Sequence, residues 1–436
     1  MMIQGFHTGV SGIKTYQTAI DVTANNLANV NTVGFRANTA EFASLFEKTL
    51  STTHGNMTHN REDMGLGSRV NTVSMTEEQG SILLTDKSTD LAIYGDGWFG
   101  VQDNKDSNIL YTRAGDFTFD ANSNLVLPDG SHVLGTMGTN IKDGITITRS
   151  DGTKEKGAEI TQKLATVDLS STEAQEPLSF PKNLVYPPEA TSKARMIGNI
   201  GTDDETRTIG AGVIDSDGHR NALQIKFTKS EIQTPPGSQW DATATIQSLD
   251  GKETYSTVNE VVEFNADGSL KSNPFTTIDN RGSDVVIDLG TGYDGVVSIA
   301  NSDITSSSIA DGTIGGDLQG YEINKNAEVI ATFTNGVQTS VGKIAVYHFQ
   351  NDQGLNRITG TKFKESSDSG EAIFFQDANG KNVIGTNIAN YQLENANVKM
   401  EVALTDLIIM QRAFDANSKC ITTADQMMQK ALQMDA

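Results

Sequence analysis

The sequence has 436 residues, 33 of them basic and 55 acidic, and its formal net charge is −22. Such an excess of negative charge argues against nucleic acid or an anionic membrane surface as a partner. No stretch approaches the roughly 18 uninterrupted apolar residues of a transmembrane helix, and the N-terminus lacks the basic and apolar regions of a cleavable signal peptide. The 41 glycines, spread among abundant polar residues, predict many short strands and turns.

The first predicted element is a helix over residues 3–30. Its large apolar side chains recur every three or four residues, which is typical of a coiled-coil seam. The seam positions are Phe6, Val10, Ile13, Ile20, Ala24 and Leu27, with the polar Gln17 among them. The helix is expected to end in a segment rich in asparagine, which contains Asn25, Asn26 and Asn29 and is followed by Gly34 and Phe35. Gly34 is expected just beyond the helix end.

Residues 31–80 are expected to form a linker, with an extended and loosely ordered part at Ser51–Arg69. Short strands follow, among them Leu91–Tyr94, Trp98–Gln102 and Ile109–Thr112. We expect residues 81–165 and 315–396 to form one inner antiparallel β domain, interrupted by an outer antiparallel β domain at 166–314. An inserted domain is tolerated because domain termini tend to lie close together.

The inner β domain is expected to have an aromatic core containing Trp98, Phe99, Tyr111 and Phe117. Arg113 is expected to play a structural role, either by pairing with a buried carboxylate or by capping backbone carbonyls. The fold class is therefore α+β and mainly β, with two nested β domains between terminal helices.

The last predicted element is a helix of coiled-coil type in residues 397–436, with Asn397 as its N-cap. We expect it to join residues 1–30 in a helical assembly domain. Cys420, the only cysteine, is expected to be a small buried residue on this helix. The seam positions are Met400, Ala403, Leu407, Met410, Phe414, Asn417, Ile421, Ala424 and Met428.

Three arrangements remain open for the two helices. They could pair with each other, their seams could meet other copies of the chain, or they could be core helices of one large domain, which the long amphipathic pattern makes less favoured. The polar seam residues Gln17 and Asn417 could set the register, or they could face water or a channel.

No pattern of catalytic, metal-binding or cofactor-binding residues emerges. The six histidines are scattered without the spacing of a zinc site. Asp215-Ser216-Asp217-Gly218 is faintly like a calcium loop but lacks its further ligands, and a hairpin turn between strands at Gly212–Asp215 and Ala222–Thr228 explains it better. The sequence therefore predicts neither an enzyme nor a cofactor.

Three groups of motifs resemble the bacterial flagellar rod and hook axial proteins. The first is Asn25-Asn26-Leu27-Ala28-Asn29 with Thr32-Val33-Gly34-Phe35-Arg36. The second combines Asp90-Leu91-Ala92-Ile93, Gly97-Trp98-Phe99 and Tyr111-Thr112-Arg113-Ala114-Gly115-Asp116-Phe117. The third is Leu393-Glu394-Asn395-Ala396-Asn397-Val398 with Gln411-Arg412-Ala413-Phe414-Asp415-Ala416-Asn417. The large inserted β region is similar to that of hook proteins within this family.

The resemblance implies a structural subunit of the flagellar hook, outside the cell. It implies self-assembly into a hollow curved tube that joins rod to filament and transmits torque as a universal joint. The implied partners are other copies of the chain, the rod, the hook cap, the hook–filament junction proteins and the type III export apparatus, which exports subunits without a cleaved signal peptide. Membrane insertion and nucleic-acid binding are not expected.

Two alternatives remain. Within the family, the chain could be a distal rod protein or a specialised hook-like paralogue, although the large insertion argues against the rod. From another class, it could be a secreted β-rich adhesin with coiled-coil ends, which would bind a ligand as a fixed oligomer.

Overall fold

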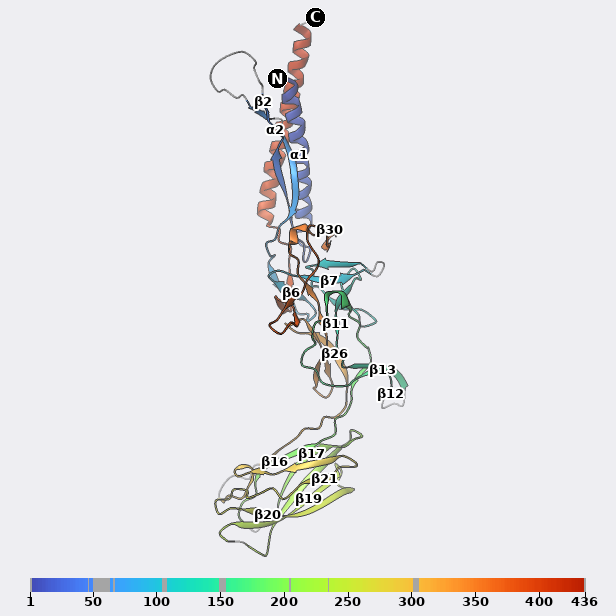
Figure 1. The fold of residues 1–436 in the computed structure, drawn as a ribbon, viewed down its shortest axis with the longest axis vertical. Coiled ribbons are helices and arrows are strands. Elements are labelled where there is room, and N and C mark those ends of the chain that lie inside the picture. The colour runs from blue at the N-terminus through green and yellow to red at the C-terminus, as the bar shows by residue number, and fades with distance from the viewer. Residues whose placement is uncertain are drawn as a thin grey trace.

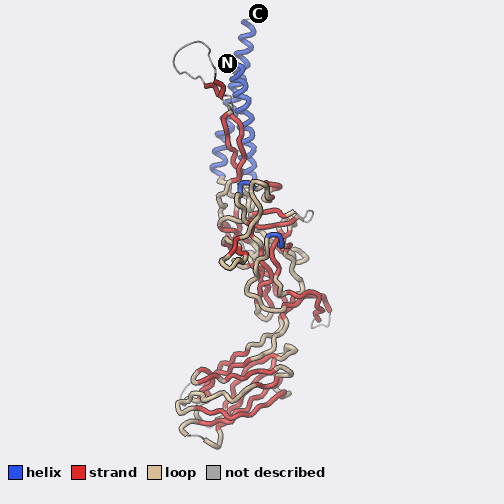
Figure 2. Tube along the Cα trace, viewed as in Figure 1, coloured by secondary structure: helices blue, strands red, loops and turns tan. Residues whose placement is uncertain are grey.

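The computed structural model describes residues 2–45, 47–49, 63–65, 67–103, 108–148, 154–203, 205–233, 235–300 and 306–434. The molecule is elongated and has three parts along its length, as Figure 1 shows. A helical shaft containing both termini stands at one end, a β-rich body lies in the middle, and a separate β-rich outer region lies at the other end. Figure 2 places the two long helices in the shaft and strands in all three parts.

The shaft pairs the two ends of the chain. Helices α1 (Met2–Ala28) and α2 (Met400–Met434) pack side by side and run in opposite directions. The sequence pattern predicted both helices because their apolar residues keep a helical period over many turns. Within the described residues, neither helix is long and apolar enough to span a bilayer.

The expectation of a linker at 31–80 is wrong for much of that stretch. Strands β1 (Asn38–Ser44) and β4 (Ser68–Met75) form an antiparallel ribbon that packs along α1. A bulge between Glu41 and Phe42 interrupts the alternation of the side chains, which weakens the period-two signal in the sequence. The ribbon continues through β2 (Glu47–Thr49) and β3 (Asp63–Gly65), and residues 51–62 of the expected loose segment lie outside the described residues.

The body is built around one large branched sheet. Its main strand order is β12-β13-β15-β26-β27-β28-β11-β7-β8-β31-β30, and smaller pairs such as β34-β6 and β35-β5 join segments from the two halves of the chain. The bounds in the first half are β5 Ile82–Leu84, β6 Leu91–Tyr94, β7 Trp98–Gln102, β8 Ile109–Thr112, β9 Thr118–Phe119, β10 Leu125–Val126, β11 His132–Met137, β12 Ile141–Thr148, β13 Lys154–Ile160, the 3-10 turn Thr172–Ala174, β14 Glu176–Pro177 and β15 Leu184–Tyr186.

The second half of the chain completes the body. Its elements are β26 Gly316–Ile323, β27 Glu328–Phe333, β28 Gln338–Ile344, β29 Val346–Tyr347, the 3-10 turn Asp352–Gly354, β30 Asn356–Thr359, β31 Lys362–Lys364, β32 Phe375–Gln376, β33 Asn382–Val383, β34 Asn387–Asn390 and β35 Gln392–Glu394. Contributions from both halves make the body one unit that encloses an insertion.

The outer region has its own core around Trp240 and Phe227, and two sheets of orders β17-β18-β19-β20 and β21-β22-β16-β24-β23. Its strands are β16 Lys193–Asn199, β17 Arg207–Ile214, β18 Arg220–Lys229, β19 Ser238–Ser248, β20 Thr254–Phe264, β21 Thr277–Asp279, β22 Asp284–Asp288, β23 Gly290–Thr291, β24 Asp294–Val297 and β25 Ser306–Ala310. Most ladders of the described residues are antiparallel, as expected, but β13–β15, β16–β22 and β16–β24 are parallel.

The expected start of the outer β domain at residue 166 is wrong. Leu178, Phe180, Leu184 and Tyr186 are buried in the core of the body, where β14 and β15 join its sheet. The sequence pattern predicts strands both before and after residue 166. Local pattern alone therefore could not assign the residues that follow this boundary to the core of the body or to the core of the outer region. Two segments then run side by side to the outer region, paired by an isolated bridge between Glu189 and Thr313.

Candidate functional site: the helical shaft and its joint with the body

The seam predicted on α2 faces α1. Ala403 and Ala424 are buried, and Leu407, Met410, Phe414, Asn417, Ile421 and Met428 are half-buried, while Met400 is exposed. The contact is close because α1 presents glycines. A Cβ atom on Gly9 would lie 2.8 Å from Ile421 Cγ1, and one on Gly12 would lie 2.6 Å from Asn417 Oδ1. Asn417 thus lies against a glycine of the partner helix.

The seam predicted on α1 does not form the centre of this contact. The buried positions of α1 are small or polar: Gly9, Gly12, Thr15, Ala19, Thr23 and Asn26. Phe6, Val10, Ile13, Ile20 and Leu27 are half-buried, and Gln17 and Ala24 are exposed. A pattern search selects large apolar residues, whereas close helix packing here uses small ones. The role of the predicted seam in assembly stays a prediction.

Helix α2 carries a second set of apolar side chains that α1 does not cover. Val402, Leu404, Ile408 and Ile409 are between 43% and 58% exposed, and Met427 is 50% exposed. The expectation of a buried Cys420 is wrong, since its side chain is exposed on the same helix. Exposed apolar side chains in this number along one helix are typical of a surface that another chain covers.

The asparagine-rich segment connects α1 to the ribbon and the body. Asn26 exchanges two hydrogen bonds with the backbone of Asn38, its Nδ2 donating to O at 2.7 Å and its Oδ1 accepting from N at 3.0 Å. Asn29 Nδ2 donates to Asn25 O at 2.9 Å. Gly34 has φ +67°, and a Cβ atom there would lie 2.3 Å from Ala114 N, so the close approach to the body requires glycine.

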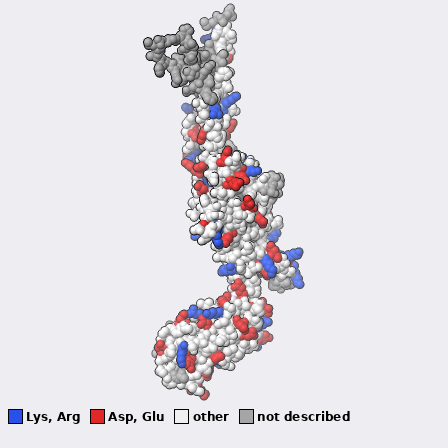
Figure 3. All heavy atoms as spheres, viewed as in Figure 1, with Lys and Arg blue, Asp and Glu red and all other residues white. Residues whose placement is uncertain are grey.

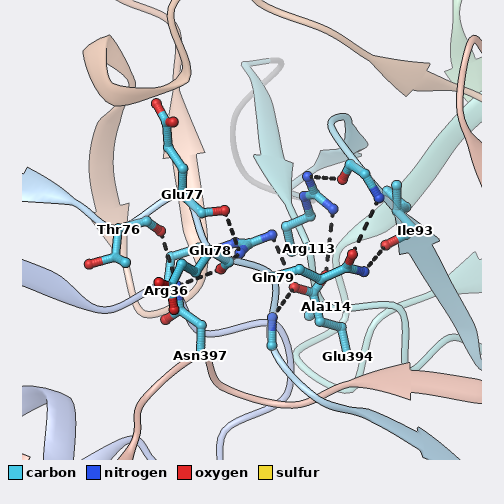
Figure 4. A network of polar contacts seen from close by, with 12 residues as sticks. Arg36, Thr76, Glu77, Glu78, Gln79, Ile93, Arg113, Ala114, Glu394 and Asn397 are labelled. Atoms are coloured by element: carbon cyan, nitrogen blue, oxygen red, sulfur yellow. Dashed lines mark hydrogen bonds and ion pairs between the residues drawn. The ribbon is translucent and has the colours of Figure 1, made fainter. Parts of the chain in front are cut away.

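A buried cluster of charges joins the shaft to the body (Figure 4). Arg36 Nη2 lies 3.0 Å from Glu394 Oε1, and Arg113 Nη1 lies 3.5 Å from Glu394 Oε2, with all three side chains at most 4% exposed. Arg113 Nη2 also donates to Gly95 O at 2.6 Å. Both structural roles expected for Arg113 are therefore present. Burial, followed by the nearby charge of Arg36, lowers the pKa of Arg113 to about 10.

Glu394 and Arg36 also hold the backbone that follows the ribbon. Gly80 N donates to Glu394 Oε1 at 3.0 Å, and Gly34 N donates to Glu394 O at 2.7 Å. Arg36 Nη1 donates to Glu77 O at 3.3 Å and to Glu78 O. One carboxylate thus connects the segment after α1, the segment after β4 and the body.

Asn397 does not cap α2 as expected. Its Oδ1 accepts from Ala37 N at 2.6 Å, and its Nδ2 donates to Thr76 O at 3.0 Å and Glu78 O at 2.8 Å. The side-chain amide of Asn397 hydrogen-bonds to three backbone groups of the N-terminal half, because residue 397 lies between the ribbon and the body. Asn397 therefore fixes the start of α2 relative to the ribbon.

Sequence reasoning missed Arg357. Its guanidinium lies over the rings of Phe35 at 4.7 Å and Phe363 at 4.9 Å, and its Nη2 donates to Arg36 O. Burial lowers the pKa of Arg357. No local motif marked this residue, since its partners Phe35 and Arg36 come from the opposite end of the chain.

The aromatic residues predicted for the inner core are buried. Trp98 packs against Phe363 with ring centroids 4.9 Å apart, Phe99 against Phe117 at 5.0 Å, and Tyr111 against Tyr347 at 5.3 Å. Burial raises the pKa of Tyr111 and of Tyr347. A polar cavity of about 230 Å³ lies beside this core, and Trp98, Arg113, His348 and Asp352 line part of it.

Asp215, Asp217 and His219 bring three potential metal ligands within 4.8 Å of one another. The Asp215 carboxylate, however, accepts from Asp217 N at 3.1 Å and His219 N at 2.8 Å, and Arg281 Nη1 lies 3.1 Å from its Oδ2. A guanidinium already in contact with the carboxylate disfavours a second cation. The hairpin turn between β17 and β18 accounts for this arrangement.

Three family models match separate parts of the chain. "Flagella basal body rod protein" matches residues 6–36, "Flagellar hook protein FlgE/F/G D1 domain" matches 92–167, and "Flagellar basal body rod FlgEFG protein C-terminal" matches 390–434. These ranges include α1 with its asparagine-rich segment, Trp98 and Arg113 of the body, and Glu394 with α2.

Curated relatives are similar over almost the whole chain. The flagellar hook protein FlgE of Borreliella burgdorferi is 29% identical over 99% of this chain and 100% of the relative. FlgE of Treponema pallidum is 27% identical over 99% and 100%, and FlgE of Escherichia coli is 26% identical over 97% and 98%. The crystal structure of Helicobacter pylori flagellar hook protein FlgE2 has a TM-score of 0.51 and 17% identity, and covers 72% of this chain and 100% of that one, which indicates a shared fold.

Proposed function

The chain belongs to the flagellar hook protein family and is a structural subunit of the flagellar hook; from this premise we propose that it polymerises into a hollow, curved tube that joins rod to filament and transmits torque as a flexible joint. The family is structural and non-enzymatic, and its members form a polymeric hook together with other flagellar components. Within the flagellum, the chain therefore belongs to the hook and basal body.

The observation that carries the proposal is the shaft surface. The two helices cover one another along a single line of contact, and Leu404, Ile408, Ile409 and Met427 remain exposed outside it. Burial of apolar surface stabilises association by about 25 cal/mol per Å² removed from water. A contact between unlike surfaces that does not close on itself generates a helical polymer.

The arrangement of the three parts supports a flexible joint. Apolar shaft surfaces supply the strong contacts between copies, whereas the acidic, hydrated outer region supplies weaker contacts that can slide as the tube bends. The outer region has 18 acidic and 9 basic residues between positions 193 and 311. Exposed ion pairs and hydrated polar contacts contribute little free energy each, so they exchange easily.

The proposed partners follow from this position in the flagellum. We assign the rod below the tube, the hook cap and the hook–filament junction proteins above it, and the type III export apparatus for delivery of the subunits. The inserted outer region argues against a rod protein, since the resemblance implies that rod proteins lack it.

The test is electron microscopy of basal bodies from a strain lacking this gene. Complete rods without hook and filament support the proposal, and a plasmid copy of the gene should restore both. Truncated rods would place the protein in the rod instead. Intact hooks and filaments would contradict the proposal outright.

A further inference from the structure

Two asparagines of the chain are followed by glycine, in Asn335-Gly336 and Asn379-Gly380. In such a dipeptide the backbone nitrogen of glycine can attack the side-chain amide of asparagine, because glycine has no side chain to obstruct the approach. A bond forms between the glycine N and the asparagine Cγ, and the side-chain nitrogen leaves as ammonia, taking the glycine proton. Water then opens the cyclic imide to aspartate or isoaspartate. Since water is the co-reactant, the reaction needs no enzyme, and such asparagines are chemically labile.

The backbone has nearly the same conformation at the two sites. Each dipeptide lies in the turn between two paired strands, β27 and β28 for Asn335 and β32 and β33 for Asn379. Both glycines have φ +79°. Each glycine also donates its N–H to the carbonyl oxygen three residues earlier, at 2.9 Å in the first turn and 3.0 Å in the second. The chain therefore contains its own comparison, in which the surroundings of the asparagine side chain are the main difference.

The side chain of Asn335 is held in place. Its Nδ2 donates to Ile314 O at 2.7 Å, and its Oδ1 accepts from Val337 N at 3.0 Å. The carbon that would be attacked is also covered, since a Cβ atom on Gly316 would lie 2.7 Å from Asn335 Cγ. To reach the geometry of the reaction, this half-buried side chain has to break both hydrogen bonds and move away from the start of β26.

The side chain of Asn379 is exposed and held far less firmly. Within the described residues its side-chain amide makes one long hydrogen bond, from Nδ2 to Asp377 Oδ2 at 3.5 Å. The other oxygen of Asp377 holds the backbone of the turn, because Oδ1 accepts from Asn379 N at 2.8 Å and from Lys381 N at 2.9 Å. Backbone hydrogen bonds, first of all the one from Lys381 N, lower the pKa of Asp377, so its carboxyl group is ionised at neutral pH.

We propose that Asn379 deamidates spontaneously in the folded chain and that its conversion loosens the β32–β33 hairpin. The product places a second carboxylate beside that of Asp377, in a body whose face in Figure 3 already carries many acidic side chains. Two like charges this close repel each other. Isoaspartate also adds a methylene group to the backbone of a turn that the Asp377 side chain holds together.

The hairpin is short enough for this change to open it. Its ladder consists of the pairs Phe375↔Val383 and Gln376↔Asn382, and a small two-stranded ribbon has little stability of its own. Phe375 packs on the ring of His348 with centroids 4.4 Å apart. Opening of the turn therefore weakens a contact between the hairpin and the core of the body.

The first experiment follows deamidation of the full chain at mildly alkaline pH by peptide mapping and mass spectrometry. In the folded chain we expect Asn379 to react at least about tenfold faster than Asn335, whose reaction requires the loss of two hydrogen bonds. In concentrated guanidinium chloride both side chains are free, and the two rates should become similar. Equal rates in the folded chain would overturn the proposal, and so would an Asn379 that stays intact while the unfolded chain reacts.

The second experiment tests the loosening with Asn379→Asp. Hydrogen exchange of the backbone amides in residues 375–383 should be severalfold faster than in the wild type. The matched control is Asn122→Asp, an exposed position in a similar turn, where Asp120 Oδ1 accepts from Asn122 N at 2.7 Å and Asn124 N at 2.8 Å. The control should leave residues 375–383 at the wild-type rate. Unchanged exchange in Asn379→Asp, or equal acceleration in both variants, would contradict the proposed loosening.

Discussion

Arg36 and Glu394 form an ion pair with 3.0 Å between Nη2 and Oε1, and both side chains are almost fully excluded from solvent. One residue follows α1 and the other precedes α2, so this pair joins the two ends of the chain at the top of the body. Arg113 approaches the same carboxylate from the body. The pair therefore determines how the shaft stands on the sheets.

Replacement of Glu394 tests this joint. Glu394→Ala leaves two buried guanidinium groups without their carboxylate and should lower the free energy of unfolding by about 3–5 kcal/mol, whereas Glu394→Gln should cost less because it keeps a hydrogen-bond acceptor. Chemical denaturation measures both. The control is Glu371→Ala at an exposed position. Equal losses for Glu394→Ala and this control would show that the joint contributes no stability.

Gly12 tests the close contact of the helices. In an open helix, alanine is favoured over glycine by about 1 kcal/mol, but a Cβ atom at Gly12 would lie 2.6 Å from Asn417 Oδ1. Gly12→Ala should therefore lower the melting temperature of assembled tubes, and Asn417→Ala should partly restore it. Gly5→Ala is the control, because no atom lies within 4 Å of its added Cβ. A rise in melting temperature for Gly12→Ala would contradict the packing described.

The two faces of α2 should respond differently to charge. Ile408→Asp places a carboxylate on an exposed position and should abolish tubes while changing monomer stability by less than about 0.5 kcal/mol. Leu407→Asp lies toward α1 and should damage both tube formation and helix pairing. Electron microscopy and circular dichroism separate the effects. Normal tubes from Ile408→Asp would remove that face from the assembly surface.

Cys420 gives a chemical probe of the same helix. Its exposed thiol should react quickly with a maleimide in the free subunit and slowly in tubes. Chains labelled beforehand with a bulky maleimide should fail to polymerise, and Cys420→Ser chains treated in the same way should polymerise normally. Mass spectrometry measures the labelling. Equal labelling rates before and after assembly would place Cys420 outside any contact between copies.

His348 should make the body sensitive to acid. Burial lowers the pKa of this side chain, whose Nε2 donates to Ile384 O at 2.6 Å. The unfolded chain therefore binds a proton more readily, and stability should fall as the pH drops below about 6.5. Burial raises the pKa of the nearby Asp352. The folded chain therefore holds the proton of this carboxyl group more tightly than the unfolded chain does, and the contribution of Asp352 to stability should fall as the pH rises above about 3.8.

The contribution of His348 is measured as a difference between two proteins. The melting temperature of the wild type minus that of His348→Gln should decrease between pH 7 and pH 5. Asp352→Asn provides the companion measurement for the carboxylate. A difference that stays constant over this range would exclude titration of His348 as a source of acid sensitivity.

The sequence predicted the elements better than the contacts between them. The long helices and strands such as Trp98–Gln102 follow from periodicity, and the seam on α2 faces the partner helix because it contains the large apolar residues. The matching face of α1 consists of glycine, alanine, threonine and asparagine, which contain no large apolar side chain. Likewise Arg113 was expected to meet a carboxylate, but only the fold identifies Glu394 as that carboxylate.

The division between body and outer region illustrates a second limit. Phe180 lies between Ser179 and Pro181, and Tyr186 lies between Val185 and Pro187, and this local pattern does not say which of the two cores buries them. The β1–β4 ribbon was missed because a bulge and a polar composition obscure its alternation. For the boundary, the decisive information lies in residues far away in the sequence, which form the core that buries Phe180 and Tyr186.

The ladders β6–β34 and β5–β35 have a consequence for the order of folding. Each joins a strand from the first quarter of the chain to one from the last. Bringing such distant segments together costs loop-closure entropy and is slow, so we expect these ladders to form after the strands enclosed between them. Once these ladders have formed, the end of α1 and the beginning of α2 lie close together, so the pairing of the two helices costs little further conformational entropy. We therefore expect the shaft to form last and to be the first part to open.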